Sequence, residues 1–227
     1  MNHVIILAGG VGSRMKSDIP KQFLLVKGLP LFMYSFRKFV SFSGIGSIVL
    51  VVSEDWLSFV QEQVKQEKVD IPVLFALAGK SRQHSVRNGL TALADFAEEQ
   101  DPVFVHDSVR PLFPLSNITD GLAALETHDA ALPVISVKDA TYQSCDGNTL
   151  SAILPRSELY SGQSPECFRY GDFVRAHEPL TDIELAGIRG CSELAFRAGL
   201  RVKLIPGTEQ NFKITTPEDL QALTLIL

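Results

Sequence analysis

Short, unbroken runs of apolar residues recur along most of the chain. They do not alternate with polar residues, so they fit strands that are buried on both faces. Strands of this kind are typical of a mainly parallel sheet, and the pattern therefore predicts an α/β fold. Six strands are predicted, over Val4–Ala8, Ser47–Val52, Val73–Leu77, Val103–His106, Ala130–Val134 and Arg201–Ile205.

Amphipathic segments lie between these runs. The stretches LPLFMYSFRKFVSF (29–42) and HSVRNGLTALADFAEE (84–99) carry apolar residues at helical spacing and predict helices. A last helix is predicted to begin after Thr216, which suits an N-cap, with Pro217 in its first turn. Two acidic residues then follow at the positive end of that helix, where they are stabilising.

The segment 136–161 breaks this alternation. Its sequence, SVKDATYQSCDGNTLSAILPRSELYS, places a Cys-Asp-Gly-Asn turn between residues that favour strands. The pattern predicts a β-hairpin that is too long and too polar to be an ordinary connection. A chain of 227 residues suits one well-buried domain, and this segment is predicted to project from it as an arm.

Composition narrows the possible partners. No apolar run approaches the roughly 18 residues of a membrane span, and we expect neither a membrane partner nor a secretory signal. The 3 cysteines are widely spaced and form no CxxC pair, which favours a reducing, cytoplasmic compartment without disulfides or a zinc site. A net charge of −5 without a basic block argues against nucleic acid, so an anionic ligand would need a local cluster of cations.

Such a cluster is suggested by LAGGVGSRMKSDIPKQF (7–23), which follows the first predicted strand. Its glycines would let backbone N–H groups close on a phosphate. The segment is not the dinucleotide pattern, because Met15 stands where a glycine is required, and it lacks the G-K-[ST] ending of the Walker loop. A tight strand-to-helix turn with solvated Arg14 and Lys21 is the alternative that these residues leave open.

The whole string G-G-x-G-S-R-M-x₅-P-K-Q-F resembles the signature of sugar-nucleotide pyrophosphorylases and nucleotidylyltransferases. Its P-K-Q ending is most similar to the 2-C-methyl-D-erythritol 4-phosphate cytidylyltransferases and their ribitol-5-phosphate relatives. Four further motifs agree in the same order, within 79–90, 103–111, 156–168 and 211–220. The resemblance implies a Rossmann-like nucleotidyltransferase fold over residues 1–227, with a mainly parallel sheet flanked by helices and a projecting β-arm.

The resemblance also implies residues for CTP. Arg14, Lys21 and Lys213 would act on the reacting phosphates and are the catalytic candidates. In GKSRQHSVRNGL (79–90) the resemblance places side chains around cytosine and ribose, although an ordinary helix capped by Ser81 is the alternative there. The nucleotide-binding candidates are Ala8, Gly9, Gly10, Gly12, Gly79, Lys80, Arg82, Ser85 and Asp107.

The motif VFVHDSVRP (103–111) resembles the family pattern H-D-x-x-R-P after a strand. An aspartate at the carboxyl end of a strand is well placed to hold a hard cation, so Asp107 is assigned to Mg²⁺ and Arg110 to the substrate phosphate. A buried structural Asp–Arg pair is the alternative. We expect the neighbouring His106 to be a hydrogen-bonded packing residue rather than a catalytic base.

The remaining candidates concern the polyol phosphate. Arg156 stands eight residues before Ser164, as a family arginine does before the threonine of T-P-Q-x-F, and both would contact the acceptor phosphate. In the family this arginine lies on an arm that crosses to the partner subunit, which implies a homodimer. Thr141 is the candidate for the arm threonine. A solvated charge is the alternative for Arg156.

Three departures from the family pattern fall on the polyol side of the site. Glu166 replaces the glutamine of T-P-Q, Thr141 stands one place late, and T-D-[DE]-A-S has no clean counterpart. The expected reaction is transfer of CMP from CTP to 2-C-methyl-D-erythritol 4-phosphate, with release of pyrophosphate, for isoprenoid precursor synthesis. D-Ribitol 5-phosphate, used in cell-wall or capsule polymers, is the alternative acceptor. A catalytically silent nucleotide-binding regulator is the second alternative.

Overall fold

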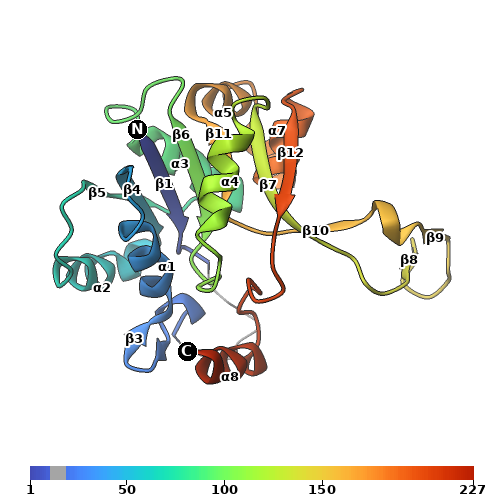
Figure 1. Cartoon of the computed structure of the whole chain (residues 1–227), viewed down its shortest axis with the longest axis horizontal. Coiled ribbons are helices and arrows are strands. Elements are labelled where there is room, and N and C mark those ends of the chain that lie inside the picture. Colours follow the sequence, from blue (N-terminus) through green and yellow to red (C-terminus); the bar gives the residue numbers. More distant parts are fainter. Residues whose placement is uncertain (11–18) are drawn as a thin grey trace.

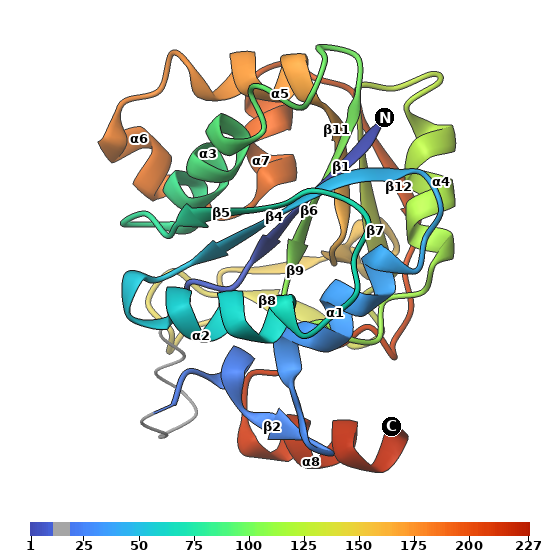
Figure 2. The ribbon, with the colours of Figure 1, turned by 90° about the vertical axis from the view of Figure 1, so that its left-hand side faces the viewer.

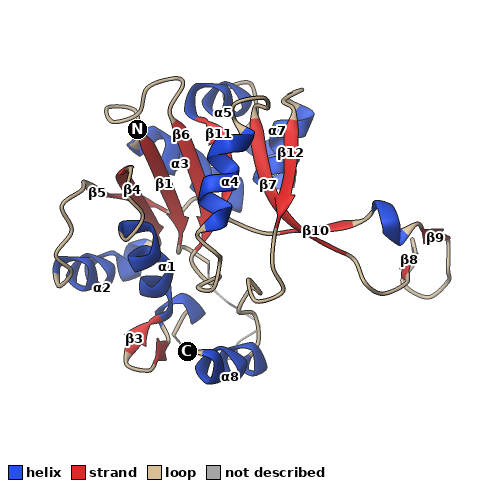
Figure 3. Cartoon of the chain, viewed as in Figure 1, coloured by secondary structure: helices blue, strands red, loops and turns tan. Residues whose placement is uncertain are grey.

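The computed structural model describes residues 1–10 and 19–227. The expectations placed on Gly12 and Arg14 fall between these ranges and lie outside the described residues. Within the described ranges, a central sheet of eight strands carries helices on both of its faces (Figures 1 and 3).

The sheet is mainly parallel, as the apolar runs predict. Its strands follow the order β10-β7-β11-β6-β1-β4-β5, and β12 also pairs with β7. Strand β1 pairs in parallel with β4 and β6, whereas β11 is antiparallel to both β6 and β7. The strands are β1 (Asn2–Leu7), β4 (Ile45–Val52), β5 (Val73–Leu77), β6 (Pro102–Asp107), β7 (Ala130–Ser136), β10 (Tyr160–Gly162), β11 (Glu166–Arg169) and β12 (Val202–Pro206).

All six predicted strands are present, and their ends differ from the prediction by one or two residues at most. Strands β10 and β11 were not predicted. Each has only three or four residues, and β11 begins with a glutamate, so neither carries a continuous apolar run.

The long strands bury alternate residues on opposite faces of the sheet. Val4 and Ile6 of β1 belong to the hydrophobic cluster that α1, α2 and α4 cover, whereas Ile5 belongs to the cluster under α3, α5, α6 and α7 (Figure 2). This burial on two faces is the reason why the strands appear in the sequence as unbroken apolar runs. These helices are α1 (Leu31–Val40), α2 (Glu54–Lys65), α3 (Arg82–Ala92), α4 (Ser116–Ala124), α5 (Tyr170–His177), α6 (Asp182–Gly187) and α7 (Cys191–Arg197).

The helix ends follow local capping chemistry. Ser81 caps α3, because its side chain accepts a hydrogen bond from the backbone N–H of His84. Thr216 caps α8 (Pro217–Ile226) in a capping box with Asp219, which confirms the predicted start of that helix. Helix α3 ends at Ala92, earlier than predicted, because the chain tightens into turns such as the one closed by Leu93 N–H on Leu90 O at 3.1 Å.

Helix α8 closes a third cluster at the end of the sheet where β1 and β6 finish (Figure 1). Its Leu223 is buried with Ile214, Leu31 and Val26. Val26 lies in the small hairpin of β2 (Leu25–Val26) and β3 (Leu29–Pro30). The C-terminal segment is therefore attached to the loop that follows β1. No helix in the described ranges is long and apolar enough to cross a membrane.

The segment 136–161, here called the β-arm, leaves the sheet after β7 and returns along β10 (Figure 1). Its tip contains the predicted hairpin, in which β8 (Thr141–Gln143) pairs antiparallel with β9 (Ala152–Leu154). The turn between them is closed by Asp146, whose Oδ1 accepts from the N–H groups of Asn148 and Thr149. The figure shows the arm reaching away from the body of the molecule.

Close packing of α3 on the sheet gives a test of this architecture. A Cβ atom added at Gly89 would lie 2.7 Å from Ile5 Cγ2 and 3.1 Å from Val51 Cγ2. Overpacking costs roughly 1–3 kcal/mol, which outweighs the gain of up to ~1 kcal/mol in helix propensity. We expect Gly89→Ala to lower the free energy of unfolding by about 1–2 kcal/mol in urea titrations.

The matched control is Gly187→Ala at the end of α6, where an added Cβ meets no heavy atom within 4 Å among the described residues. This variant should stay within about 0.5 kcal/mol of the wild type. Equal stability of the two variants would contradict the close approach of α3 to β1 and β4.

Candidate active site

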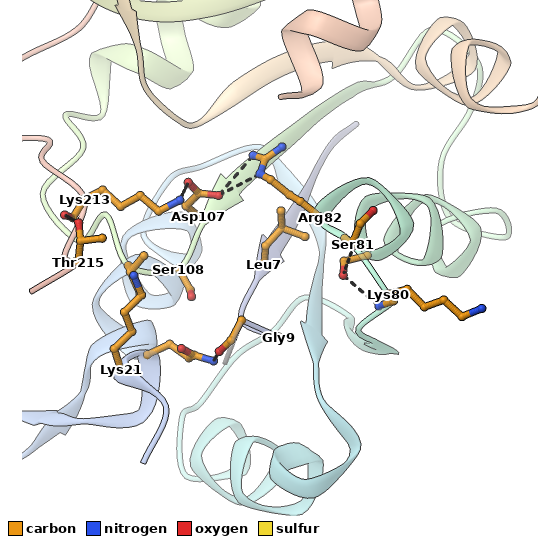
Figure 4. A pocket seen from close by; sticks show the side chains of 15 residues that line it. Leu7, Gly9, Lys21, Lys80, Ser81, Arg82, Asp107, Ser108, Lys213 and Thr215 are labelled. Carbon is orange, nitrogen blue, oxygen red and sulfur yellow. Dashed lines mark hydrogen bonds and ion pairs between the residues drawn. The ribbon is translucent and has the colours of Figure 1, made fainter. Parts of the chain in front are cut away.

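A cavity of about 450 Å³ opens at the carboxyl ends of β1 and β6 (Figure 4). This is the edge at which ligands bind in open α/β sheets. Four separate parts of the chain line it. They are the loop after β1 (Gly9, Gly10, Lys21 and Gln22), the start of α3 with the loop before it (Gly79, Lys80, Ser81, Arg82 and Ser85), the end of β6 (Asp107, Ser108 and Val109) and the segment before α8 (Lys213 and Thr215).

Asp107 is the centre of the charge cluster in this cavity. Lys213 Nζ lies 2.8 Å from Asp107 Oδ2, and Arg82 reaches Oδ1 through NH2 at 3.3 Å. Arg110 Nε lies 3.9 Å from Oδ2. Burial acts to raise the pKa of Asp107, but Arg82 and Lys213 outweigh it and hold that pKa well below its ordinary value. The carboxylate is therefore ionised and held on both oxygens.

The two arginines beside Asp107 are also held by other groups. Arg110 donates from NH1 to Asn211 O at 2.6 Å, which fixes it to the segment before α8. Arg82 donates from NH2 to Glu166 Oε1 at 3.2 Å and from NH1 to Cys191 Sγ at 2.9 Å. Both guanidinium groups are therefore positioned before any ligand is bound.

Lys21 and Gln22 join the loop after β1 to the rest of the site. Lys21 Nζ donates to Ile214 O at 2.8 Å, next to Lys213 in sequence. Gln22 is buried, and its Nε2 donates to Ala8 O and Gly10 O, each at 2.7 Å. Sequence reasoning missed Gln22. Its position after Lys21 in the P-K-Q string was the available signal.

The backbone groups predicted for phosphate are not equally free. The N–H of Ala8 donates to Val51 O at 2.8 Å and therefore continues the sheet. Gly9 is needed for packing, because an added Cβ would lie 2.2 Å from Ala78 Cβ. At Gly10 an added Cβ meets no heavy atom within 4 Å among the described residues, so none of them crowds this position. Of these three residues, Gly10 is the best placed to meet a ligand.

The segment before α3 is held by its own hydrogen bonds. The N–H of Gly79 donates to Ser85 Oγ at 3.0 Å, and that hydroxyl donates to Ser81 O at 3.1 Å. The capped helix that sequence left open as an alternative is thus present, and it also lines the cavity. The side chain of Lys80 is exposed and points away from Asp107 (Figure 4).

Ser164 lies behind Asp107 rather than in the lining of the cavity. Its hydroxyl accepts from the N–H of Asp107 at 3.1 Å and pairs with His106 Nδ1 at 3.1 Å. His106 is buried, and its Nε2 lies 3.2 Å from Ser35 Oγ. Burial lowers the pKa of His106 to about 3, so the ring is neutral and hydrogen-bonded on both nitrogens. The prediction that His106 is a packing residue is confirmed.

Thr141 and Arg156 are not brought to this cavity by their own chain. Both lie on the β-arm, which projects from the body of the molecule (Figure 1). Arg156 is exposed and donates from NH1 to Lys138 O at 3.1 Å, and Thr141 donates from Oγ1 to Asp139 O at 3.3 Å. Any role at an active site would therefore require another copy of the chain.

Comparison with known proteins agrees with this geometry. The model of the family "IspD: 2-C-methyl-D-erythritol 4-phosphate cytidylyltransferase" matches residues 2–227. The chain belongs to this family. It is 34% identical over 220 residues to a 2-C-methyl-D-erythritol 4-phosphate cytidylyltransferase of Clostridium novyi, covering 96% of this chain and 93% of the relative.

Members with a second named activity are also similar. A ribitol-5-phosphate cytidylyltransferase of Lactiplantibacillus plantarum is 30% identical over 230 residues, covering 100% of this chain and 98% of the relative. Among solved structures, the IspD of Francisella tularensis superposes with a TM-score of 0.83 and 24% identity, and the match covers 100% of both chains. At this identity the likeness shows the shared fold.

The departure at Glu166 contacts the residue that follows a second departure from the family pattern. Glu166, which stands where the family has glutamine, accepts from the N–H and the hydroxyl of Ser192, both at 2.7 Å on Oε2. Ser192 lies in the first turn of α7, directly after the segment in which T-D-[DE]-A-S has no clean counterpart. A carboxylate from β11 thus stabilises the start of this helix. Sequence reasoning noted the change at Glu166 but had no signal that Glu166 contacts Ser192.

The charge cluster predicts a pH dependence of stability. Because the pKa of Asp107 is depressed on folding, its ionisation stabilises the folded state above its unfolded pKa of about 3.9. That contribution is lost as the pH falls below this value. We expect Asp107→Asn to lose roughly 2–4 kcal/mol of unfolding free energy at pH 7, and this deficit to shrink between pH 5 and pH 2 in denaturant titrations.

Asp129→Asn is the control, because Asp129 pairs with Arg201 at the surface and should cost less than about 1 kcal/mol. A deficit in Asp107→Asn that stays constant down to pH 2 would contradict the depressed pKa. Because burial lowers the pKa of His106, the free energy of unfolding should also decrease as the pH falls below about 6.5. This decrease should persist in both variants.

Proposed function

We propose that this protein is a cytidylyltransferase that transfers CMP from CTP to 2-C-methyl-D-erythritol 4-phosphate and releases pyrophosphate. The observation that carries the proposal is the cavity in which Lys21, Arg82 and Lys213 converge with Asp107. The family to which the chain belongs supports the choice of nucleotide and acceptor.

The charges of the cavity suit a nucleoside triphosphate, which carries about four negative charges. The whole chain has a net charge of −5, so the attraction must come from this local cluster rather than from the overall field. Lys21 and Lys213 line the cavity from segments far apart in the sequence, and Lys80 borders it. In the proposed complex the ammonium groups neutralise the phosphates, and the backbone at Gly10 lets the triphosphate approach closely.

The reaction itself needs little acid–base chemistry. An oxygen of the acceptor phosphate attacks the α-phosphorus of CTP, the bond to the bridging oxygen breaks, and pyrophosphate leaves with the electron pair. A phosphate monoester has a second pKa near 6, so the nucleophile is already ionised at neutral pH. His106 is neutral, buried and hydrogen-bonded, and it is not needed as a base. Positioning of two anions and stabilisation of developing charge remain.

Lys213 is the best candidate to stabilise that developing charge. Its side chain is 39% exposed, and among the described residues its ammonium group pairs with Asp107 alone, whereas Arg82 and Arg110 have further partners. A lysine also has a flexible stem with rotatable donors. We therefore assign Lys213, together with Lys21, to the reacting phosphates. The catalytic role proposed from sequence for Arg14 remains a prediction.

Mg²⁺ is proposed as the accompanying cation. Mg²⁺ commonly binds through one or two carboxylates together with substrate phosphates and water. The described residues hold no group of three or more His, Cys, Asp or Glu side chains suited to a metal, but Asp107 supplies one ionised carboxylate at the cavity. These residues fit an ion that arrives with the triphosphate, where it would neutralise phosphate charge.

D-Ribitol 5-phosphate is the second candidate acceptor. Two of its cytidylyltransferases, from Lactiplantibacillus plantarum and Streptococcus pneumoniae, are 30% and 34% identical to this chain. Neither Glu166 nor Thr141 lines the cavity that we propose for CTP, so the lining of that cavity does not distinguish the two candidates.

A direct assay decides between these acceptors. Purified protein is supplied with CTP, Mg²⁺ and either polyol phosphate, and pyrophosphate release is measured. We expect turnover with 2-C-methyl-D-erythritol 4-phosphate, and we expect Lys213→Ala to lower kcat by roughly 10²–10³ through loss of one preorganised cation. Turnover confined to D-ribitol 5-phosphate would establish the second candidate. Magnesium-independent CTP binding without turnover on either acceptor would favour a silent regulator.

The β-arm supports a further part of the proposal, that the protein acts as a homodimer. Tyr142 and Ile153 on its hairpin are 61% and 69% exposed, which is unfavourable for a segment that projects into solvent. Arg156 lies on the same arm, away from the cavity of its own chain. We propose that the arm packs on a second copy and carries Arg156 to the acceptor phosphate there.

Subunit mixing tests this arrangement. Arg156→Ala and Asp107→Ala should each be nearly inactive alone, whereas a hybrid dimer contains one site with both native residues. After dissociation and random reassociation, activity should recover to roughly a quarter of the wild-type value. Arg156→Ala should also keep its CTP affinity, measured by calorimetry. Confirmed hybrids without recovered activity, or loss of CTP binding in Arg156→Ala, would contradict the shared site.

A further inference from the structure

Glu166 belongs to the charge cluster around Asp107 although it does not line the cavity. Its carboxylate is buried and does not line the cavity, so it does not touch a ligand bound there. It contacts Arg82 instead, and Arg82 does line the cavity. Glu166 can therefore influence a ligand in two ways, by its contact with Arg82 and by its own negative charge.

One nitrogen of Arg82 is divided between two carboxylates. NH2 lies 3.3 Å from Asp107 Oδ1 and 3.2 Å from Glu166 Oε1. A guanidinium NH2 group has two hydrogens, so each carboxylate can accept one. Figure 4 shows Arg82 reaching Asp107 from the side opposite Lys213. Asp107 therefore shares Arg82 with a second anion.

Glu166 and Arg82 are also hydrogen-bonded to residues at the start of α7. Glu166 Oε2 is held by the N–H and the hydroxyl of Ser192, each at 2.7 Å. Arg82 NH1 donates to Cys191 Sγ at 2.9 Å, and burial raises the pKa of this thiol to about 12, so the sulfur is neutral. The start of α7 thus fixes the carboxylate and the guanidinium with respect to each other.

We propose that Glu166 is a positioning residue that holds Arg82 through a second carboxylate and so leaves Asp107 available to the metal-bound nucleotide. This inference rests on the proposed function. If Asp107 were the sole counter-ion of Arg82, a cation that binds Asp107 would have to displace the guanidinium from its last carboxylate. With Glu166 in place, Arg82 keeps one ion pair and stays in position.

A glutamine at this position could not hold Arg82 by an ion pair. Its side chain has one acceptor oxygen and one NH₂ donor group. If the oxygen accepts from Ser192 N–H, the NH₂ group faces the donors of Arg82, which repels the guanidinium toward Asp107. Asp107 would then be bound more tightly by Arg82 and would compete less well for Mg²⁺. The site would also gain one unit of positive charge and attract metal-free CTP more strongly.

Glu166→Gln should therefore raise the affinity for metal-free CTP and also raise the Mg²⁺ concentration that the reaction requires. By calorimetry in EDTA, we expect its affinity for CTP to rise about three- to tenfold, because one nearby negative charge is lost. In the pyrophosphate assay, we expect the Mg²⁺ concentration for half-maximal rate to rise by a similar factor. Damage to the fold would instead lower the affinity and the rate together. Glu193→Gln, in helix α7 and paired with Arg197, is the matched control and should change neither quantity more than twofold.

The effect of Glu166→Gln on the Mg²⁺ requirement should also depend on Arg82. In an Arg82→Gln background, adding Glu166→Gln should leave the Mg²⁺ requirement unchanged, and this comparison serves if Glu166→Gln alone fails to fold. A Mg²⁺ requirement that still shifts in that background would overturn the proposal, as would a Glu166→Gln protein identical to the wild type in both measurements. A wild-type protein that binds no CTP would overturn the proposed function, and this inference with it.

Discussion

The carboxylate of Asp107 is the point on which the site depends, because it holds several cations that would otherwise repel one another. Two unit charges 4 Å apart interact by about 4 kcal/mol at an effective dielectric constant of about 20. Arg82, Arg110 and Lys213 come from three parts of the chain and meet around this one group. Its ionisation therefore lets these three cations lie close together.

The sheet supports this arrangement by making its edge rigid. Strands β1 and β6 pair from His3–Val103 to Leu7–Asp107, and burial on both faces fixes the position at which each strand ends. The loops beyond that edge are then tied to one another, as when Lys21 donates to Ile214 O. Because each loop is held at a rigid edge and by a distant partner, the cations are positioned without help from a ligand. Preorganisation of this kind is what transfer between two anions requires.

Much of the fold could be predicted because its causes are local. The unbroken run at Val4–Ala8 and the cap at Thr216 each reflect a rule that acts within a few residues. What could not be predicted depends on partners far away in sequence. Strand β11 exists because it fits between β6 and β7, and Gly9 is a glycine because Ala78 lies against it. A motif suggested that Gly9 approaches phosphate, which stays a prediction, and the structure adds a packing constraint at the same residue.

The candidate site, too, could be predicted only in part from the sequence. The motifs indicated Asp107, Arg82 and Lys213, and the structure brings these three together. They did not indicate what each would be bonded to, and those bonds distinguish the residues. Among the residues that the structure describes, Arg82 is bonded to two carboxylates and a thiol, whereas Lys213 is partly exposed and bonded to one carboxylate. A cation with several fixed partners can shape a site, but a cation with one partner can leave it for a phosphate. The placement of counter-ions, rather than the number of cations, therefore decides which positive charge is free to act. In the proposed homodimer the same argument would apply to Arg156, because a cation carried on a separate element needs no carboxylate of the cavity to hold it beside the others.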